Sequence, residues 1–153
     1  MQKIASFQIN HDTLVPGLYV SRVDGDVVTY DLRMRIPNGG DYLSTAAAHT
    51  LEHLFATYVR SSVYSPAIVY VGPMGCRTGF YFLTRDSMTR PEVLNVLKET
   101  FAFIHAFEGE IPGARRIECG NYLDHDLFAA KKEAAAYLET LSRWTAEKMA
   151  YPD

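Results

Sequence analysis

The stretch GLYVSRVDGDVVTYDLRMRI, residues 17–36, decides the fold class, because it predicts two strands joined by a tight turn. Asp24 followed by Gly25 is a dipeptide that favours the short turns of β-hairpins. In the second half of the stretch, apolar side chains alternate with polar ones, as in a strand with one covered face. The apolar set is Val28, Tyr30, Leu32, Met34 and Ile36. We therefore expect a β-hairpin that packs one face against a core.

A helix and two further strands are expected after the hairpin. The run PNGG at 37–40 breaks the chain, and Ser44 is a suitable N-cap for a helix that runs to about Ser61. The β-rich runs AIVYV at 67–71 and FYFLT at 80–84 then flank a glycine-rich loop. Strands that follow each other in the sequence favour an antiparallel sheet.

Two more helices complete the expected architecture. Thr89 and Glu92 match a capping box that opens a helix ending near Gly109, and an Ala-, Lys- and Glu-rich stretch predicts a last helix from about Asp124 to Met149. The order of elements indicates an α+β fold of two layers, with a largely antiparallel sheet packed against helices. No repeat or linker is visible, so we expect residues 1–153 to form a single domain.

Composition narrows the classes of function. Hydrophobic residues make up 48% and charged residues 22%, which is typical of a folded soluble protein. A net charge of −3 without a Lys/Arg cluster argues against nucleic acid as a partner. No apolar run could span a membrane or serve as a signal sequence, so we expect the cytoplasm. In that reducing compartment, Cys76 and Cys119 are metal ligands, catalytic thiols or inert buried thiols rather than a disulfide.

The helix expected after Ser44 carries a pattern typical of metal sites. His49, Glu52 and His53 form H-x-x-E-H and lie on one face of a helix. Two imidazoles one turn apart can bind one divalent ion, and the carboxylate beside it suits a general base. The alternative is a helix with two exposed or half-buried histidines. A catalytic ion needs a third ligand, for which the chain offers Cys119 or Glu133. A thiolate would favour Zn²⁺, Fe²⁺ or Co²⁺ over Mg²⁺ or Ca²⁺.

The loop GPMGCRTG at 72–79 presents the other thiol. Its glycines allow a ligand to approach the backbone near Cys76. The neighbouring cation of Arg77 would favour the thiolate. The alternative is a glycine-rich hairpin with a packed thiol. The combination of a histidine face, two thiols and a carboxylate favours a catalytic site.

These motifs resemble those of the S-ribosylhomocysteine lyases, also called LuxS or autoinducer-2 synthases. The family's HTLEHL is present at 49–54, its PMGC-x-TG-[FY]-Y at 73–81, and its late CG and HDL-like pair at 119–120 and 125–127. Its N-terminal SF-x-x-x-H is matched by Ser6, Phe7 and His11, and its DLR and PN by residues 31–33 and 37–38. The matches follow the family order along nearly the whole chain.

The resemblance implies a cytosolic homodimer of the LuxS-like metallohydrolase type. Its metal ligands would be His49, His53 and Cys119, with Cys76 and Glu52 as the catalytic acid/base pair. The metal would be Fe²⁺, which Zn²⁺ or Co²⁺ can replace. The implied reaction cleaves S-ribosylhomocysteine to homocysteine and 4,5-dihydroxypentane-2,3-dione, the precursor of the quorum-sensing signal autoinducer-2.

The resemblance also implies substrate-binding residues. Arg33 would contact the substrate, and Ser6 and His11 would reach across the dimer interface into the partner's pocket. Two positions depart from the family pattern: Tyr70 stands where many members have Asp, and Arg35 where Cys is frequent. These departures bear on how the amino-acid tail of the substrate is held.

Two other functions use the same residues differently. H-x-x-E-H is also the signature of inverzincin peptidases, which would need a glutamate such as Glu133 as third ligand and would leave both cysteines without a role. A noncatalytic metal-binding domain would close the site with a fourth protein ligand, for which Cys76 is the best candidate.

Overall fold

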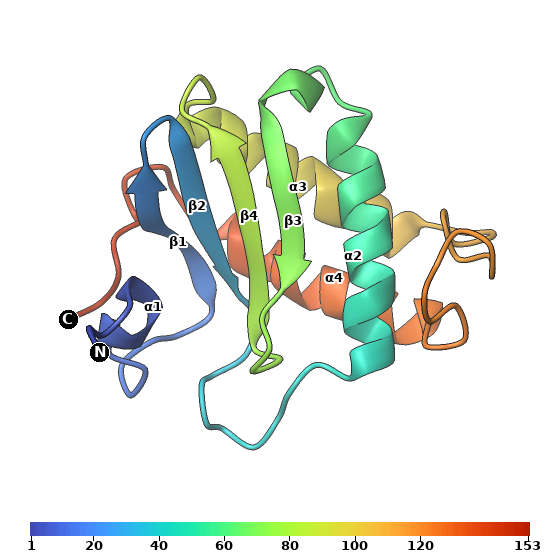
Figure 1. The fold of residues 1–153 in the computed structure, drawn as a ribbon, viewed down its shortest axis with the longest axis horizontal. Helices are drawn as coiled ribbons and strands as arrows, with labels where there is room; N and C mark the ends of the chain where they lie inside the picture. Colours follow the sequence, from blue (N-terminus) through green and yellow to red (C-terminus); the bar gives the residue numbers. More distant parts are fainter.

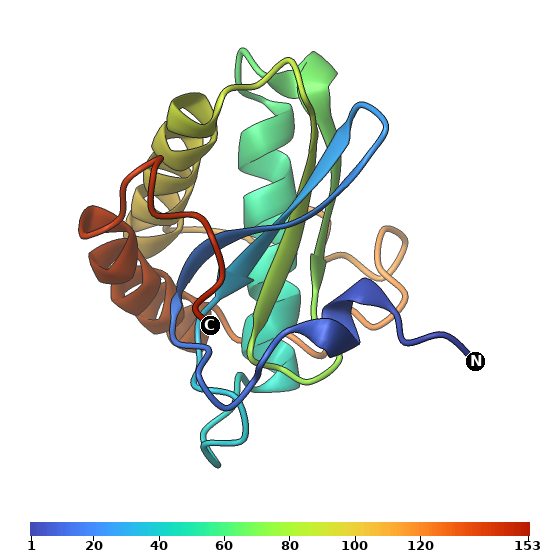
Figure 2. The ribbon, with the colours of Figure 1, turned by 90° about the vertical axis from the view of Figure 1, so that its left-hand side faces the viewer.

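The computed structural model describes residues 1–153 and has an α+β architecture, as predicted. One four-stranded sheet is covered on one face by three long helices, α2, α3 and α4, while the short α1 lies on the other side (Figures 1 and 2). The elements in chain order are α1 (Ala5–Gln8), β1 (Gly17–Asp24), β2 (Val27–Arg33), α2 (Thr45–Arg60), the 3-10 turn η1 (Ser65–Ala67), β3 (Ile68–Pro73), β4 (Gly79–Arg85), α3 (Arg90–Ala106) and α4 (Leu127–Ser142). None of the helices combines the length and the apolar composition that crossing a bilayer requires.

The sheet is fully antiparallel, with strand order β1-β2-β4-β3. The predicted hairpin is confirmed, and Gly25 in its turn has a φ of 58°, a conformation that glycine adopts without strain. The central pairing of β2 with β4 joins segments about fifty residues apart in the sequence. This pairing sets Arg33 at the end of β2 directly opposite Gly79 at the start of β4.

Aromatic side chains lock α2 onto the sheet. Phe55 of α2 is fully buried, and its ring centroid lies 5.3 Å from Phe82 of β4 and 5.4 Å from Phe101 of α3. Tilted and edge-on arrangements at these distances are favourable for aromatic pairs. Because α2 is held between β4 and α3, the face that carries its histidines has a fixed position relative to the sheet.

The predicted helix starts are confirmed by their caps. The Ser44 side chain accepts a hydrogen bond from the backbone N–H of Ala47, and Thr89 and Glu92 form a complete capping box. The predicted ends are less accurate, because α3 ends at Ala106 rather than near residue 109.

The last helix is much shorter than predicted, from Leu127 to Ser142 instead of 124–149. Beyond it the chain turns back along β1, where the Trp144 indole N–H donates to the Leu18 carbonyl and the Met149 carbonyl accepts from the Val20 N–H. These long-range bonds outweigh the local helix propensity of the segment, as tertiary contacts commonly do.

The prediction that β2 has only one covered face is wrong at its C-terminal end. Asp31 and Arg33, on the expected polar face, are 0% and 2% exposed. Tyr151 from the C-terminal segment folds over them, and its hydroxyl donates to Asp31 Oδ2. Ile36, expected on the apolar face, lies beyond the end of the strand and is exposed.

Candidate metal centre

Two elements bring four potential metal ligands together. His49 and His53 come from one face of α2, and Cys119 and His125 come from the loop between α3 and α4. Their ligand atoms all lie within 4.8 Å of one another. Cys119 Sγ is 3.4 Å from His49 Nε2 and 4.0 Å from His53 Nε2. The structure therefore joins the predicted histidine pair to Cys119 across about 70 residues of sequence.

The histidine pair is oriented for metal binding. His49 Nδ1 lies 2.8 Å from the Asp124 carbonyl, and His53 Nδ1 lies 2.8 Å from the Pro112 carbonyl. A carbonyl can only accept, so each Nδ1 carries the proton and each Nε2 presents its lone pair toward Cys119. In a tetrahedral site with Zn–S of about 2.3 Å and Zn–N of about 2.0 Å, nitrogen and sulfur lie roughly 3.5 Å apart. The separations in this cluster fit such an ion.

His125 is the cluster residue that sequence reasoning left without a role. Its Nε2 lies 3.9 Å from Cys119 Sγ, and its ring stacks on that of His49. Burial lowers the pKa of His125, and positive charge on the neighbouring His49 or His53 would lower it further. The HDL-like run contains this residue, but no helical spacing relates position 125 to position 49, so the sequence offered only the family motif as a signal.

A cavity of about 340 Å³ connects the metal helix to the cysteine loop. His49 and Glu52 line it from α2, and Gly75 and Arg77 line it from the loop between β3 and β4. Gly75 and Arg77 are the two neighbours of Cys76. The two predicted catalytic residues thus belong to segments that face each other across one cavity.

Cys76 lies at the end of a hydrogen-bonded chain that begins in the sheet. Arg33 donates to both oxygens of Asp31 and, from Nη1, to Thr78 Oγ1 at 2.8 Å. Thr78 Oγ1 lies 3.0 Å from Cys76 Sγ. Because the Thr78 oxygen already accepts from Arg33, its proton is available for the sulfur, which is the arrangement that stabilises a thiolate.

The cation joined to Cys76 is therefore Arg33, acting through Thr78. Burial alone would lower the pKa of Arg33, but the hydrogen bond and charge of Asp31, with the negative form of Cys76, raise it above the ordinary value. Arg77, which the sequence suggested for this role, instead extends over the Tyr42 ring. A substrate contact of Arg33 stays a prediction, since its guanidinium is buried and already bonded.

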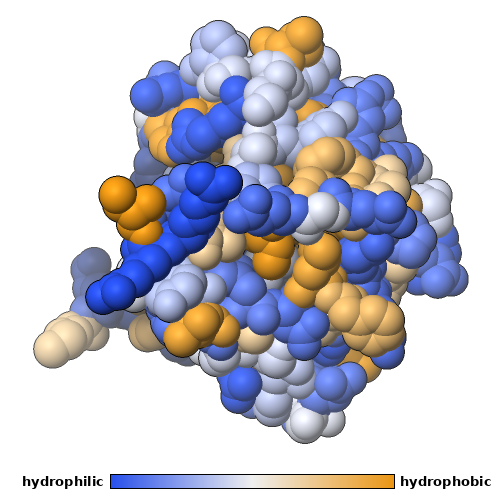
Figure 3. Space-filling view, turned by 90° about the vertical axis from the view of Figure 1, so that its right-hand side faces the viewer, coloured by the Kyte–Doolittle hydropathy of each residue, from blue (hydrophilic) through white to orange (hydrophobic).

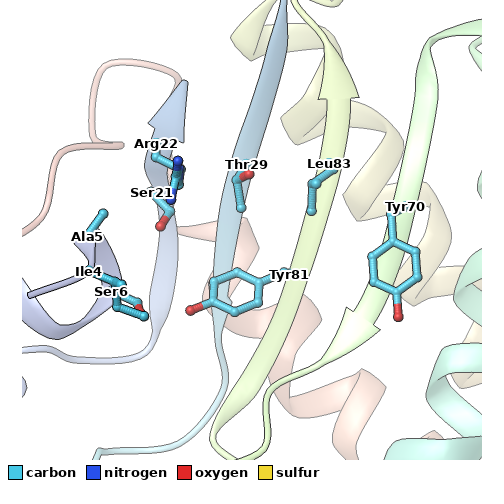
Figure 4. Close-up of a pocket in the computed structure, with 9 residues that line it drawn as sticks. All are labelled: Ile4, Ala5, Ser6, Ser21, Arg22, Thr29, Tyr70, Tyr81 and Leu83. Atoms are coloured by element: carbon cyan, nitrogen blue, oxygen red, sulfur yellow. The ribbon is translucent and has the colours of Figure 1, made fainter. Parts of the chain in front are cut away.

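The other predicted substrate residues lie apart from the metal cluster. Ser6 of α1 lines a separate cavity of about 290 Å³, into which Tyr81 of β4 extends beside it, with Tyr70 at the far side (Figure 4). His11 Nδ1 is bonded to the Ile9 carbonyl. Neither residue joins the metal ligands within one chain.

Glu133, the alternative third ligand, is also absent from the cluster. Its carboxylate forms an ion pair with Arg35 that is largely shielded from solvent.

The loop that carries Cys119 is exposed at Ile117 and Leu123, and the face on which it lies mixes hydrophobic with hydrophilic side chains (Figure 3). His49 belongs to the cluster and also lines the cavity that Glu52 borders, so the metal cluster adjoins this cavity.

Comparisons with known proteins identify the family of this chain. The family model described as S-Ribosylhomocysteinase (LuxS) matches residues 4–148. S-ribosylhomocysteine lyases from Clostridium acetobutylicum and Porphyromonas gingivalis are 47% and 49% identical to this chain, each over 100% of both chains. That of Phocaeicola vulgatus is 48% identical over 99% of this chain and 98% of its own. This chain belongs to the LuxS family of S-ribosylhomocysteinases.

Proposed function

We propose that this chain is a metal-dependent lyase that cleaves the thioether of S-ribosylhomocysteine. The products are homocysteine and 4,5-dihydroxypentane-2,3-dione, the autoinducer-2 precursor. The observation that carries the proposal is the convergence of His49, His53 and Cys119 beside a cavity that Glu52 and the Cys76 loop both border. Full-length similarity to proteins named S-ribosylhomocysteine lyase supports the same activity.

Three residues would hold the metal. His49 and His53 present Nε2 lone pairs, and Cys119 supplies a thiolate, a donor set that suits Fe²⁺, with Zn²⁺ or Co²⁺ as substitutes. When bound, such an ion acts as a Lewis acid that stabilises negative charge on a carbonyl oxygen of the sugar. Three protein ligands leave a position for the substrate.

The chain's own residues would move the protons. The thioether can be eliminated only after the sugar carbonyl has migrated until the sulfur lies β to it. Each migration removes a proton from a carbon next to the carbonyl and returns a proton to the neighbouring carbon, so two proton-transfer groups are needed. Glu52, which lines the cavity from α2, and Cys76, whose two chain neighbours line it from the facing loop, would supply them. In the last step a proton leaves the α carbon, the C–S bond breaks, and homocysteine departs with the bonding electrons.

The geometry around Cys76 suits a base. The Thr78 hydroxyl faces the sulfur, and the Arg33–Asp31 pair behind it is almost completely buried. A charged donor held in this way stabilises the thiolate without filling the cavity.

The functional unit we propose is a cytoplasmic homodimer with active sites at the interface. Within one chain Ser6 lines a different cavity from Glu52, and His11 is not among the clustered ligands, which supports a role for both in the partner's pocket. Arg33, Ser6 and His11 are then the residues that bind the substrate.

The two competing functions are less well supported. A peptidase of the inverzincin type needs a third glutamate ligand, and the carboxylate of Glu133 is paired with Arg35. A closed site built with Cys76 is disfavoured because Cys76 bonds to Thr78 and is not among the clustered ligands.

The deciding experiment measures thiol release from S-ribosylhomocysteine with a thiol reagent, using protein metallated under anaerobic conditions. We expect Cys119→Ala to lose the metal, and Cys76→Ala to retain stoichiometric metal but lose turnover. Wild-type protein that carries metal and releases no thiol would contradict the lyase assignment. A Cys76→Ala variant without metal would favour the closed site instead.

A further inference from the structure

We propose that His125 is a positioning residue that donates its Nε2 proton toward the Cys119 sulfur, and is not a fourth metal ligand. The inference rests on the proposed ligand set of His49, His53 and Cys119. It assigns a role to a histidine that lies within ligand distance of the site yet differs from the other two in its hydrogen bonds and ring orientation.

The first observation concerns Thr50, which holds the Nδ1 side of His125. Thr50 is fully buried in α2, and its Oγ1 accepts a hydrogen bond from the Asp126 backbone N–H at 3.0 Å. Its only other partner is His125 Nδ1, also at 3.0 Å. The hydroxyl proton therefore goes to Nδ1, because a buried hydroxyl that donates nothing loses a hydrogen bond.

This assignment fixes the tautomer of His125. When Nδ1 accepts, the proton of the neutral imidazole sits on Nε2, and a protonated nitrogen cannot ligate a metal. The other two rings are the opposite case, because the Nδ1 atoms of His49 and His53 face carbonyl oxygens and must donate. The hydrogen-bond partner of each Nδ1 therefore sets the role of each ring. The carbonyl oxygens make His49 and His53 ligands, and the Thr50 hydroxyl makes His125 a donor.

The second observation is the orientation of the rings. His49 and His53 are nearly perpendicular, with an interplanar angle of 83°, so their in-plane lone pairs can converge on one point. His49 and His125 are stacked, with centroids 3.9 Å apart and an angle of 22°. An imidazole lone pair lies in the plane of its ring, so the stacked rings of His49 and His125 direct their in-plane lone pairs along roughly parallel planes and not toward one point.

The position of the Nε2 proton has a chemical consequence. His125 Nε2 is 3.9 Å from Cys119 Sγ, a separation at which an N–H can interact with a thiolate. Donors to a ligating sulfur withdraw charge from it and tune the metal. With His125 as donor, the ion keeps three protein ligands and an open position, whereas a third imidazole would close the site.

The test uses zinc-loaded and cobalt-substituted protein with matched variants. His125→Phe keeps a stacked ring but removes the donor, and His125→Gln keeps a donor. Thr50→Val removes the hydroxyl, and Thr50→Ser keeps it. X-ray absorption should show two imidazoles and one thiolate in wild type and in both His125 variants, and metal binding by His125→Phe should weaken by about 10- to 100-fold.

Two spectroscopic readouts separate a donor from a structural residue. The thiolate-to-cobalt charge-transfer band should move to lower energy in His125→Phe and return in His125→Gln. Two-bond ¹⁵N–¹H correlations should place the His125 proton on Nε2 in wild type and Thr50→Ser, but not in Thr50→Val. Three imidazoles on zinc in wild type, or one ligand fewer in His125→Phe, would overturn the proposal. Failure of the ligand set itself would appear separately, as metal retained by Cys119→Ala.

Discussion

Thr78→Val tests whether the chain from Arg33 to Cys76 activates the thiol. Valine has the shape of threonine and keeps the packing of this buried position, but it removes the only group that connects the guanidinium to the sulfur. Cys76 Sγ would lose the donor 3.0 Å away, and Arg33 Nη1 would lose its acceptor at 2.8 Å. The Arg33–Asp31 pair is left in place by the substitution.

The magnitude follows from the charge on the sulfur. A hydrogen bond to a charged group contributes about 1.5 to 3 kcal/mol, and each 1.36 kcal/mol is about a factor of ten. The thiolate population at neutral pH should therefore fall about 10- to 150-fold. The more basic sulfur left in Thr78→Val is also the better nucleophile, which offsets about half of this effect on a logarithmic scale, so the rate of alkylation of Cys76 should fall about 3- to 12-fold. Thr78→Ser keeps the hydroxyl and should stay within about twofold of wild type, since it changes only packing.

The assay is the alkylation rate of Cys76 by iodoacetamide at fixed neutral pH. Metal-loaded protein keeps Cys119 occupied, and mass spectrometry of the peptide that carries Cys76 separates the two thiols. Circular dichroism confirms that the variants are folded. Equal rates for wild type and Thr78→Val would refute the reasoning, because the hydroxyl would then contribute nothing to the thiolate.

Three further predictions concern stability. Phe55→Ala should lower the free energy of unfolding by about 3 to 5 kcal/mol, because a fully buried ring between β4 and α3 is lost. Urea denaturation measures this free energy. A loss below about 1 kcal/mol would contradict the prediction and show that the core repacks to fill the cavity. Gly17→Ala should cost about 1 to 3 kcal/mol, since a Cβ there would lie 2.2 Å from the Trp144 ring. Gly120→Ala, which meets nothing within 4 Å, is the control, and an equal melting temperature for both variants would contradict the packing argument. Burial raises the pKa of Tyr137 well above 10, so its stabilising contribution is present below pH 10 and is lost as the pH rises further, because only the unfolded chain ionises. The free energy of unfolding should therefore fall less steeply above pH 10 in Tyr137→Phe than in wild type, and parallel slopes would argue against the assignment.

Much of the local structure follows from the sequence, because its causes lie within a few residues. The turn at Gly25, the cap at Ser44 and the capping box of Thr89 and Glu92 involve neighbours in the chain, and each is present as expected. The histidine face of α2 follows from helical periodicity alone. The family motifs also point to Cys119, the distant thiol that lies in the cluster with His49 and His53.

The tertiary structure decided what depends on residues far apart in the chain. Only folding sets Arg33 opposite Gly79 and so connects the guanidinium to Cys76, and only folding stacks His125 on His49. The end of α4 likewise depends on β1, because the Leu18 carbonyl of β1 accepts a hydrogen bond from the Trp144 indole N–H. Local patterns determine where helices and strands begin because caps and turns act over three or four residues. The chemistry of the site depends on which hydrogen-bond donor meets which acceptor across the packed layers, and that is a property of the folded chain.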